Sequence, residues 1–82
     1  MNINVTFTRM LLSQAHELVK LHFPDVNLKS AWVYKYPRDH WEFHGPDEFY
    51  WHGSAGTAYE ARYKGWMAWL AKKGINLDNI QE

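Results

Sequence analysis

The chain has 82 residues, enough for a single domain (1–82) near the lower size limit for a fold that rests on one apolar core. It contains no cysteine, which excludes disulfide bonds and thiolate metal sites, and 17% of its residues are aromatic, so large rings must supply the core. Nine basic and nine acidic residues cancel, so no net charge favours a nucleic acid or a membrane surface, and no stretch has the length of a membrane span.

The first seven residues allow two interpretations. Polar and apolar residues alternate through NINVTF, residues 2–7, which is the period of a half-buried strand; a frayed terminus over residues 1–7 is the alternative. The segment MNINVTFTRMLLSQ has no basic region followed by an apolar run and a cleavage site. We therefore expect a soluble protein of the cytoplasm.

Residues 8–23 are predicted to form an amphipathic helix, because the apolar residues follow a helical period from Thr8 onward. The predicted apolar side consists of Leu11, Leu12, Ala15, Leu18, Val19 and His22. Pro24 ends the helix, because the residue before a proline avoids the helical conformation. On this pattern His22 packs at the edge of the helix, whereas His16 is solvated.

Three strands are predicted at residues 30–36, 40–44 and 48–53, from their content of valine and aromatic residues and the turn residues between them. The loop of the second hairpin decides how its strands pair. A two-residue turn would mix the aromatic and histidine-bearing faces, whereas a three-residue loop that ends in a left-handed Glu48 keeps each face uniform. The sequence therefore predicts the three-residue loop, in which Phe43 pairs with Trp51 and Glu42 pairs with His52.

Residues 57–73 are predicted to form the second helix, with Thr57 and Glu60 as a capping box and Gly74 as the stop. One side of this helix carries the small residues Ala58, Ala61, Gly65 and Ala68. A second side carries the large residues Tyr59, Tyr63, Trp66 and Leu70. The sheet can cover one side, and the first helix or a second subunit must cover the other. Residues 75–82 are predicted to be a mobile tail.

The expected fold is α+β: a three-stranded antiparallel sheet, with an optional further strand at the N-terminus, and two helices packed on one face. The element order is an optional strand, a helix, three strands and a helix. If Ala31 and Val33 face the helices, the opposite face of the sheet is open. That face carries the candidate binding residues Trp32, Tyr34, Tyr36, His40, Glu42, His44, Tyr50 and His52.

Such a surface predicts a small, non-enzymatic binding module without a cofactor, because Trp and Tyr lose little rotamer entropy on binding and offer both a ring and a polar tip. A protein is the expected partner, and a second copy of the chain, giving a homodimer, is an alternative. Single-stranded or double-stranded nucleic acid is another alternative, with Lys29, Lys35 and Arg38 as phosphate contacts.

Catalysis has weaker support in the sequence. Ser30 and Ser54 lie in no nucleophile motif, and there is neither a cysteine nor a glycine-rich phosphate loop, so we predict no catalytic residue. The remaining alternative is a metal-dependent hydrolase that uses Glu42 and His52 with one further ligand. We predict no metal site, because the histidines follow no recognised ligand spacing and no thiolate is available.

The order of a helix, three strands and a helix resembles the double-stranded RNA-binding domain. At the start of the second helix, where that family has a lysine cluster, this chain has SAGTAYEARYK, so the resemblance implies the topology and not the RNA-binding function. The segments WEFHGPDEFYWHGSA and AYEARYKGWMAWL are similar to small proteins encoded by phages and prophages. That resemblance implies an accessory or host-interaction role.

Overall fold

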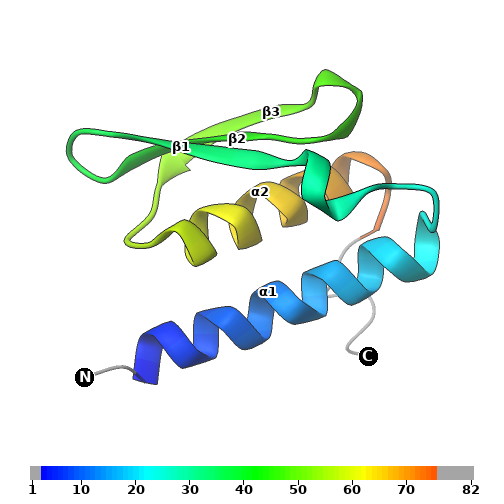
Figure 1. The fold of residues 1–82 in the computed structure, drawn as a ribbon, viewed down its shortest axis with the longest axis horizontal. Coiled ribbons are helices and arrows are strands. Elements are labelled where there is room, and N and C mark those ends of the chain that lie inside the picture. The colour runs from blue at the N-terminus through cyan, green and yellow to red at the C-terminus, as the bar shows by residue number, and fades with distance from the viewer. Residues whose placement is uncertain (1–2, 76–82) are drawn as a thin grey trace.

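The computed structural model describes the backbone of residues 3–75 and the side chains of residues 8–75. Two helices and three strands make up the fold, which is α+β as predicted (Figure 1). In chain order they are α1 (Ile3–His22), β1 (Trp32–Tyr36), β2 (His40–His44), β3 (Tyr50–Ser54) and α2 (Ala58–Lys72). A short 3-10 helix (Leu28–Ser30) precedes β1, and a tight turn (Pro46–Glu48) precedes β3. The predicted tail lies outside the described residues, apart from Ile75.

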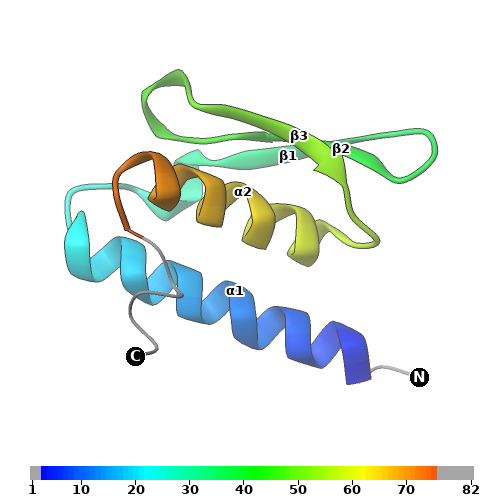
Figure 2. The ribbon, with the colours of Figure 1, turned by 180° about the vertical axis from the view of Figure 1, so that it is seen from behind.

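The molecule has three layers: the sheet, α2 and α1. The sheet is an antiparallel meander in the order β1-β2-β3. Both helices lie on the same side of it, with α2 against all three strands and α1 packed mainly on the far side of α2 (Figures 1 and 2). The opposite face of the sheet is covered by no described segment (Figures 1 and 2).

The prediction of a strand at residues 2–7 is wrong, because Ile3 already belongs to α1. The two residues before it lie outside the described part of the chain. A strand needs a sheet edge to pair with, and α1 lies in the layer farthest from the sheet (Figure 1). Extending an existing helix costs less than starting a new element, so the segment continues α1 toward the N-terminus.

The second hairpin has the predicted three-residue loop and register. Phe43 is opposite Trp51, and Glu42 is opposite His52. The backbone N–H of Gly45 donates to the carbonyl oxygen of Phe49 at 2.9 Å, which closes the loop around residues 46–48. The left-handed residue predicted at position 48 is also found, with φ of 62°.

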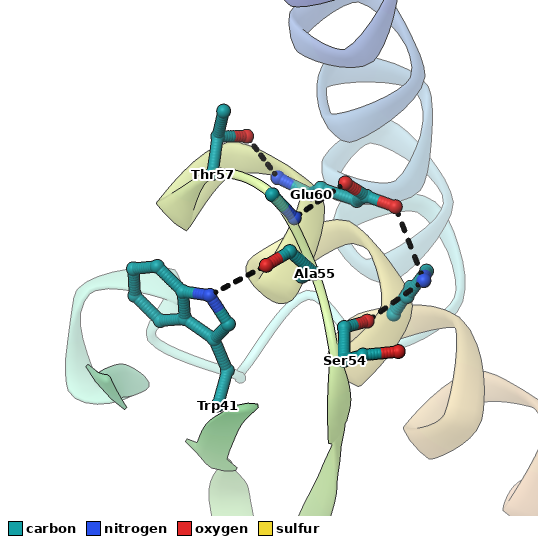
Figure 3. Close-up of polar contacts among 7 residues, drawn as sticks. Trp41, Ser54, Ala55, Thr57 and Glu60 are labelled. Atoms are coloured by element: carbon teal, nitrogen blue, oxygen red, sulfur yellow. Dashed lines mark hydrogen bonds and ion pairs between the residues drawn. The ribbon is translucent and has the colours of Figure 1, made fainter. Parts of the chain in front are cut away.

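Both ends of α2 follow the local signals in the sequence, and Figure 3 shows its N-terminal end. Thr57 Oγ1 accepts from the backbone N–H of Glu60 at 3.1 Å, and Glu60 Oε1 accepts from the backbone N–H of Gly56 at 2.9 Å. At the C-terminus Gly74 has a φ of 89°, and the backbone N–H of Ile75 returns to the carbonyl oxygen of Leu70 at 2.8 Å. This is a Schellman motif, and it confirms Gly74 as the stop.

The two apolar sides of α2 have the two partners that the sequence required. On the sheet side, Gly65 lies directly against the ring of Phe43, and Ala61 packs with Trp41 and Ala55. The other side belongs to a buried cluster with α1 residues. That cluster consists of Leu12, Ala15, Val19, Phe43, Trp66, Trp69 and Leu70. The first helix covers Trp66 and Leu70 on the second side of α2, whereas Tyr59 on that side is exposed.

Two histidines of α1 differ from their predicted environments. His16 is half-buried, with its ring 6.1 Å from that of Trp66 in an edge-on contact, rather than solvated. It lies four residues after Leu12, so it extends the buried side of the helix by one position. Burial is the main cause of its lowered pKa, and the cations of Arg62 and Lys20 add to the effect. His22 was predicted to pack but is exposed, because α1 ends there.

Candidate functional site

The sheet side away from the helices, which we call the open face, carries nine side chains from alternate strand positions. The residues are Trp32, Tyr34, Tyr36, His40, Glu42, His44, Tyr50, His52 and Ser54. They include all eight predicted binding residues, and Ser54 is the one that sequence analysis did not place there. The strand register arranges them in three rows across the sheet, which read Trp32–His44–Tyr50, Tyr34–Glu42–His52 and Tyr36–His40–Ser54.

The large rings of the open face are accessible to solvent. Trp32 is 51% exposed, Tyr34 53% and Tyr50 47%, whereas the buried rings of Trp41 and Phe43 lie on the helix side of the same sheet. The alternation that buries one face of each strand therefore leaves the other face as an aromatic surface. These rings are not part of the core formed by the described residues.

Glu42 occupies the centre of the open face, where it receives hydrogen bonds from all three strands. The hydroxyl groups of Tyr36 and Tyr50 both donate to Oε2, at 2.9 and 2.8 Å. The Nε2 atom of His44 lies 3.1 Å from Oε1. An ionised carboxylate only accepts hydrogen bonds, so Nε2 of His44 must carry the proton. The side chain of Glu42 is 19% exposed, so these contacts hold it in place without removing it from solvent.

The hydrogen bonds shift the pKa values of their partners in opposite directions. The pKa of Glu42 is lowered, first by the hydrogen bond from His44 and then by the one from Tyr50, because each favours the ionised carboxylate. The pKa values of Tyr36 and Tyr50 are raised, because each hydroxyl would lose its bond to Glu42 on deprotonation. The centre of the open face therefore holds a negative charge at neutral pH.

Ring contacts form a series that runs around Glu42. The series starts with Trp32, which is stacked on His44 with 3.9 Å between centroids and 5° between planes. It continues at centroid distances of 4.8 to 6.1 Å through Tyr50, His52, His40 and Tyr36 to Tyr34. No ring contact joins the two ends of the series. The rings therefore surround the carboxylate, and the series is interrupted only on β1, between Trp32 and Tyr34.

A metal-dependent hydrolase would need Glu42, His52 and one further ligand at a single site. Glu42 and His52 are opposite each other as predicted, but the hydrogen bonds of Glu42 go to His44 and two tyrosines. Among residues 3–75 no group of three or more His, Cys, Asp or Glu side chains is placed to hold a metal ion. Among the histidines of the open face, only His44 has a hydrogen bond to Glu42.

The cations expected to contact phosphates do not lie on the open face. Lys35 is opposite Trp41 in the register, so its side chain belongs to the helix side of the sheet, and it forms an ion pair with Asp39 at 3.9 Å. Arg38 lies in the turn between β1 and β2, and Lys29 in the 3-10 helix before β1. The nine side chains of the open face include neither lysine nor arginine.

Sequence analysis missed the partners of Glu42. Direct pairing across the strands brings Glu42 opposite Tyr34 and His52, yet its hydrogen bonds come from the diagonal residues Tyr36 and Tyr50. Diagonal neighbours on one sheet face are within reach of long aromatic side chains, so the register alone allows both arrangements. Side-chain rotamers select between them, and no residue pattern indicates the choice.

A second apolar surface lies on α1. A hollow of about 320 Å³ is lined by Gln14, Glu17, Leu18 and Leu21, and Leu21 is 72% exposed. Functional pockets combine an apolar wall with several converging polar groups, and this hollow is mostly apolar. It therefore supports no ligand prediction.

Comparison with known proteins gives no match to a family model, to a curated protein or to a solved structure. The resemblances to the double-stranded RNA-binding domain and to phage-encoded proteins therefore stay predictions. Within the described residues no helix is long and apolar enough to cross a membrane.

Proposed function

We propose that this protein is a small binding module that recognises a protein partner through the open face. The observation that carries the proposal is the placement of exposed aromatic rings around one ionised carboxylate on a sheet face that no described segment covers. An accessory or host-interaction role, as the phage resemblance implies, would be exercised in the cytoplasm and through this surface.

The contacts within the open face favour binding because they limit its freedom before a partner arrives. Tyr36 and Tyr50 are held by Glu42, and Trp32 is held by stacking on His44. Side chains that are already ordered lose less conformational entropy on association. Tyrosine and tryptophan are also the residue types that contribute most to protein interfaces.

Single-stranded nucleic acid is the second candidate, because exposed rings on a sheet are suited to base stacking. Two features oppose it. A phosphate backbone would meet the carboxylate of Glu42 at the centre of the open face, and none of its nine side chains is a lysine or arginine. A protein partner avoids both difficulties.

The proposal is tested by selecting displayed random peptides on the immobilised full chain and measuring the affinity of the enriched peptides for variants. Tyr34→Ala should weaken binding by about 1 to 3 kcal/mol, because it removes an exposed ring from the surface. Its thermal unfolding should match that of the wild type. Tyr59→Ala is the matched control, since Tyr59 is an exposed tyrosine that lies on α2 rather than on the open face.

Two outcomes would contradict the proposal. In one, enriched peptides bind the Tyr34→Ala and wild-type proteins equally well. In the other, no peptide is enriched, whereas a single-stranded oligonucleotide of roughly ten nucleotides binds with an affinity that falls steeply with salt. The second outcome would assign the open face to nucleic acid.

A further inference from the structure

The open face has one formal charge, and it is negative. Of its nine side chains only Glu42 is an acid, and the others are aromatic residues, histidines and one serine. The electron-rich faces of Trp and Tyr rings attract cations, so the rings and the carboxylate favour the same kind of ligand group. A positively charged ligand group would therefore complement the charge of this surface.

The carboxylate keeps one position for a further hydrogen bond. Two carboxylate oxygens together accept about four hydrogen bonds. Oε2 accepts two, from Tyr36 and Tyr50, whereas Oε1 is bound only by His44 among the described residues. A donor that reaches Oε1 would complete the set without displacing either tyrosine.

The interruption of the series of rings on β1 is where we expect such a donor to approach. Trp32 and Tyr34 stand at its two sides and are the most exposed aromatic residues of the described chain. Both belong to β1, an edge strand of the sheet, and Tyr34 is directly opposite Glu42. A flat group entering there would pass between two accessible rings.

Among protein side chains, arginine fits these features best. Its guanidinium group is planar, stacks on aromatic rings and donates charge-assisted hydrogen bonds to carboxylates. A lysine ammonium is a more strongly hydrated point charge and does not stack. A second copy of the chain fits less well, because a two-fold axis through the centre of the open face would bring two Glu42 carboxylates toward each other.

We propose that the open face recognises an arginine side chain of its protein partner, with Glu42 as the counter-ion and Trp32 and Tyr34 as the flanking rings. This inference rests on the proposed function and specifies the chemistry of the partner.

The test uses two small probes of nearly equal shape, N-acetylarginine methylamide and N-acetylcitrulline methylamide, in which a planar cationic guanidinium is replaced by a planar neutral ureido group. Each is titrated into the isotopically labelled full chain and followed by nuclear magnetic resonance. We expect the arginine probe to bind about tenfold more tightly than the citrulline probe. Only the cation is attracted to the faces of the rings and donates charge-assisted hydrogen bonds to the Glu42 carboxylate. The shifted resonances should belong to Trp32, Tyr34, Glu42 and His44.

Two variants then identify the counter-ion. Glu42→Gln keeps an acceptor oxygen for the tyrosines but removes the charge, so the preference for arginine over citrulline should disappear. Glu17→Gln removes an equal charge from the exposed surface of α1 and should keep the preference. Equal binding of the two probes by the wild type would overturn the inference without any variant, as would a preference that persists in Glu42→Gln.

The peptides selected on the open face separate this inference from the proposed function. Replacing each arginine of a selected peptide by citrulline should abolish most of its affinity for the wild type. Peptides that depend on Tyr34 but contain no essential arginine would leave the proposed function standing and overturn the inference. Peptides that do not depend on Tyr34 would overturn both.

Discussion

At the centre of the open face, the Glu42 carboxylate links side chains from all three strands. Its donors are Tyr36 from β1, His44 from β2 and Tyr50 from β3. Each of these bonds exists in full only while Glu42 is ionised and the tyrosines are protonated. The contribution of this one residue to stability therefore depends on pH at both ends of the scale.

Glu42→Gln should flatten the pH profile of unfolding. The pKa of Glu42 is lowered by folding, so its contribution is present above the usual value of about 4.3 and is lost as pH falls through the lowered pKa. The pKa values of Tyr36 and Tyr50 are raised, so their contribution is present below about 10 and is lost as pH rises through the raised values.

Urea unfolding of the wild type and Glu42→Gln from about pH 3 to about pH 11 measures both effects. At both the acidic and the alkaline end of this pH range, the variant should lose less unfolding free energy than the wild type. Glu17→Gln is the control and should follow the wild type. A profile for Glu42→Gln parallel to that of the wild type would show that the three hydrogen bonds add nothing to folding.

The two hairpins share an unusual loop. Each has a proline followed by two left-handed residues that are not glycine: Arg38 and Asp39 in the first, Asp47 and Glu48 in the second. A left-handed conformation costs an ordinary residue about 1 to 2 kcal/mol. The sequence predicted this conformation at Glu48, because only that loop length separates the two sheet faces. Pairing of the strands therefore outweighs the strain of the loop.

Glu48→Gly should stabilise the protein by about 1 kcal/mol, because glycine adopts the left-handed conformation without strain and this gain exceeds its larger entropy loss on folding. Thermal and urea unfolding measure the change. The same substitution at Glu17, an exposed helix position, should destabilise by a similar amount. A loss of stability in Glu48→Gly would show that this loop is not strained.

The layered architecture depends on how closely α2 approaches the sheet. A Cβ atom at Gly65 would overlap with the ring of Phe43, which is itself fully buried. The opposite side of α2 carries Trp66 and Leu70 into the cluster shared with α1. Any displacement of α2 from the sheet therefore disturbs both interfaces of the middle layer.

Gly65→Ala should destabilise the protein by about 1 to 3 kcal/mol, although alanine is the better helix former by about 1 kcal/mol. The added methyl group must displace either Phe43 or the whole helix. Gly56→Ala is the control, since a Cβ there meets only the Glu60 carboxylate at 3.6 Å. Urea unfolding compares the two variants, and an unchanged or raised stability of Gly65→Ala would contradict the close approach.

The sequence by itself determined the features whose signals are local. Strand alternation predicted that all eight candidate residues lie on one sheet face. The separation of the aromatic face from the histidine-bearing face predicted the loop length, and with it the pairing of Phe43 with Trp51. The capping box at Thr57 and the stop at Gly74 were also predicted correctly. Each of these depends on residues a few positions apart, so the sequence contains the whole signal.

Only the tertiary structure decided the features that depend on distant neighbours. The helical start of α1 follows from its place in the layer away from the sheet, and the burial of His16 follows from the position of Trp66 in α2. The donors to Glu42 depend on rotamers chosen among several side chains within reach. Packing between segments far apart in the chain fixes these features. The residue pattern of one segment does not indicate where the other segment lies.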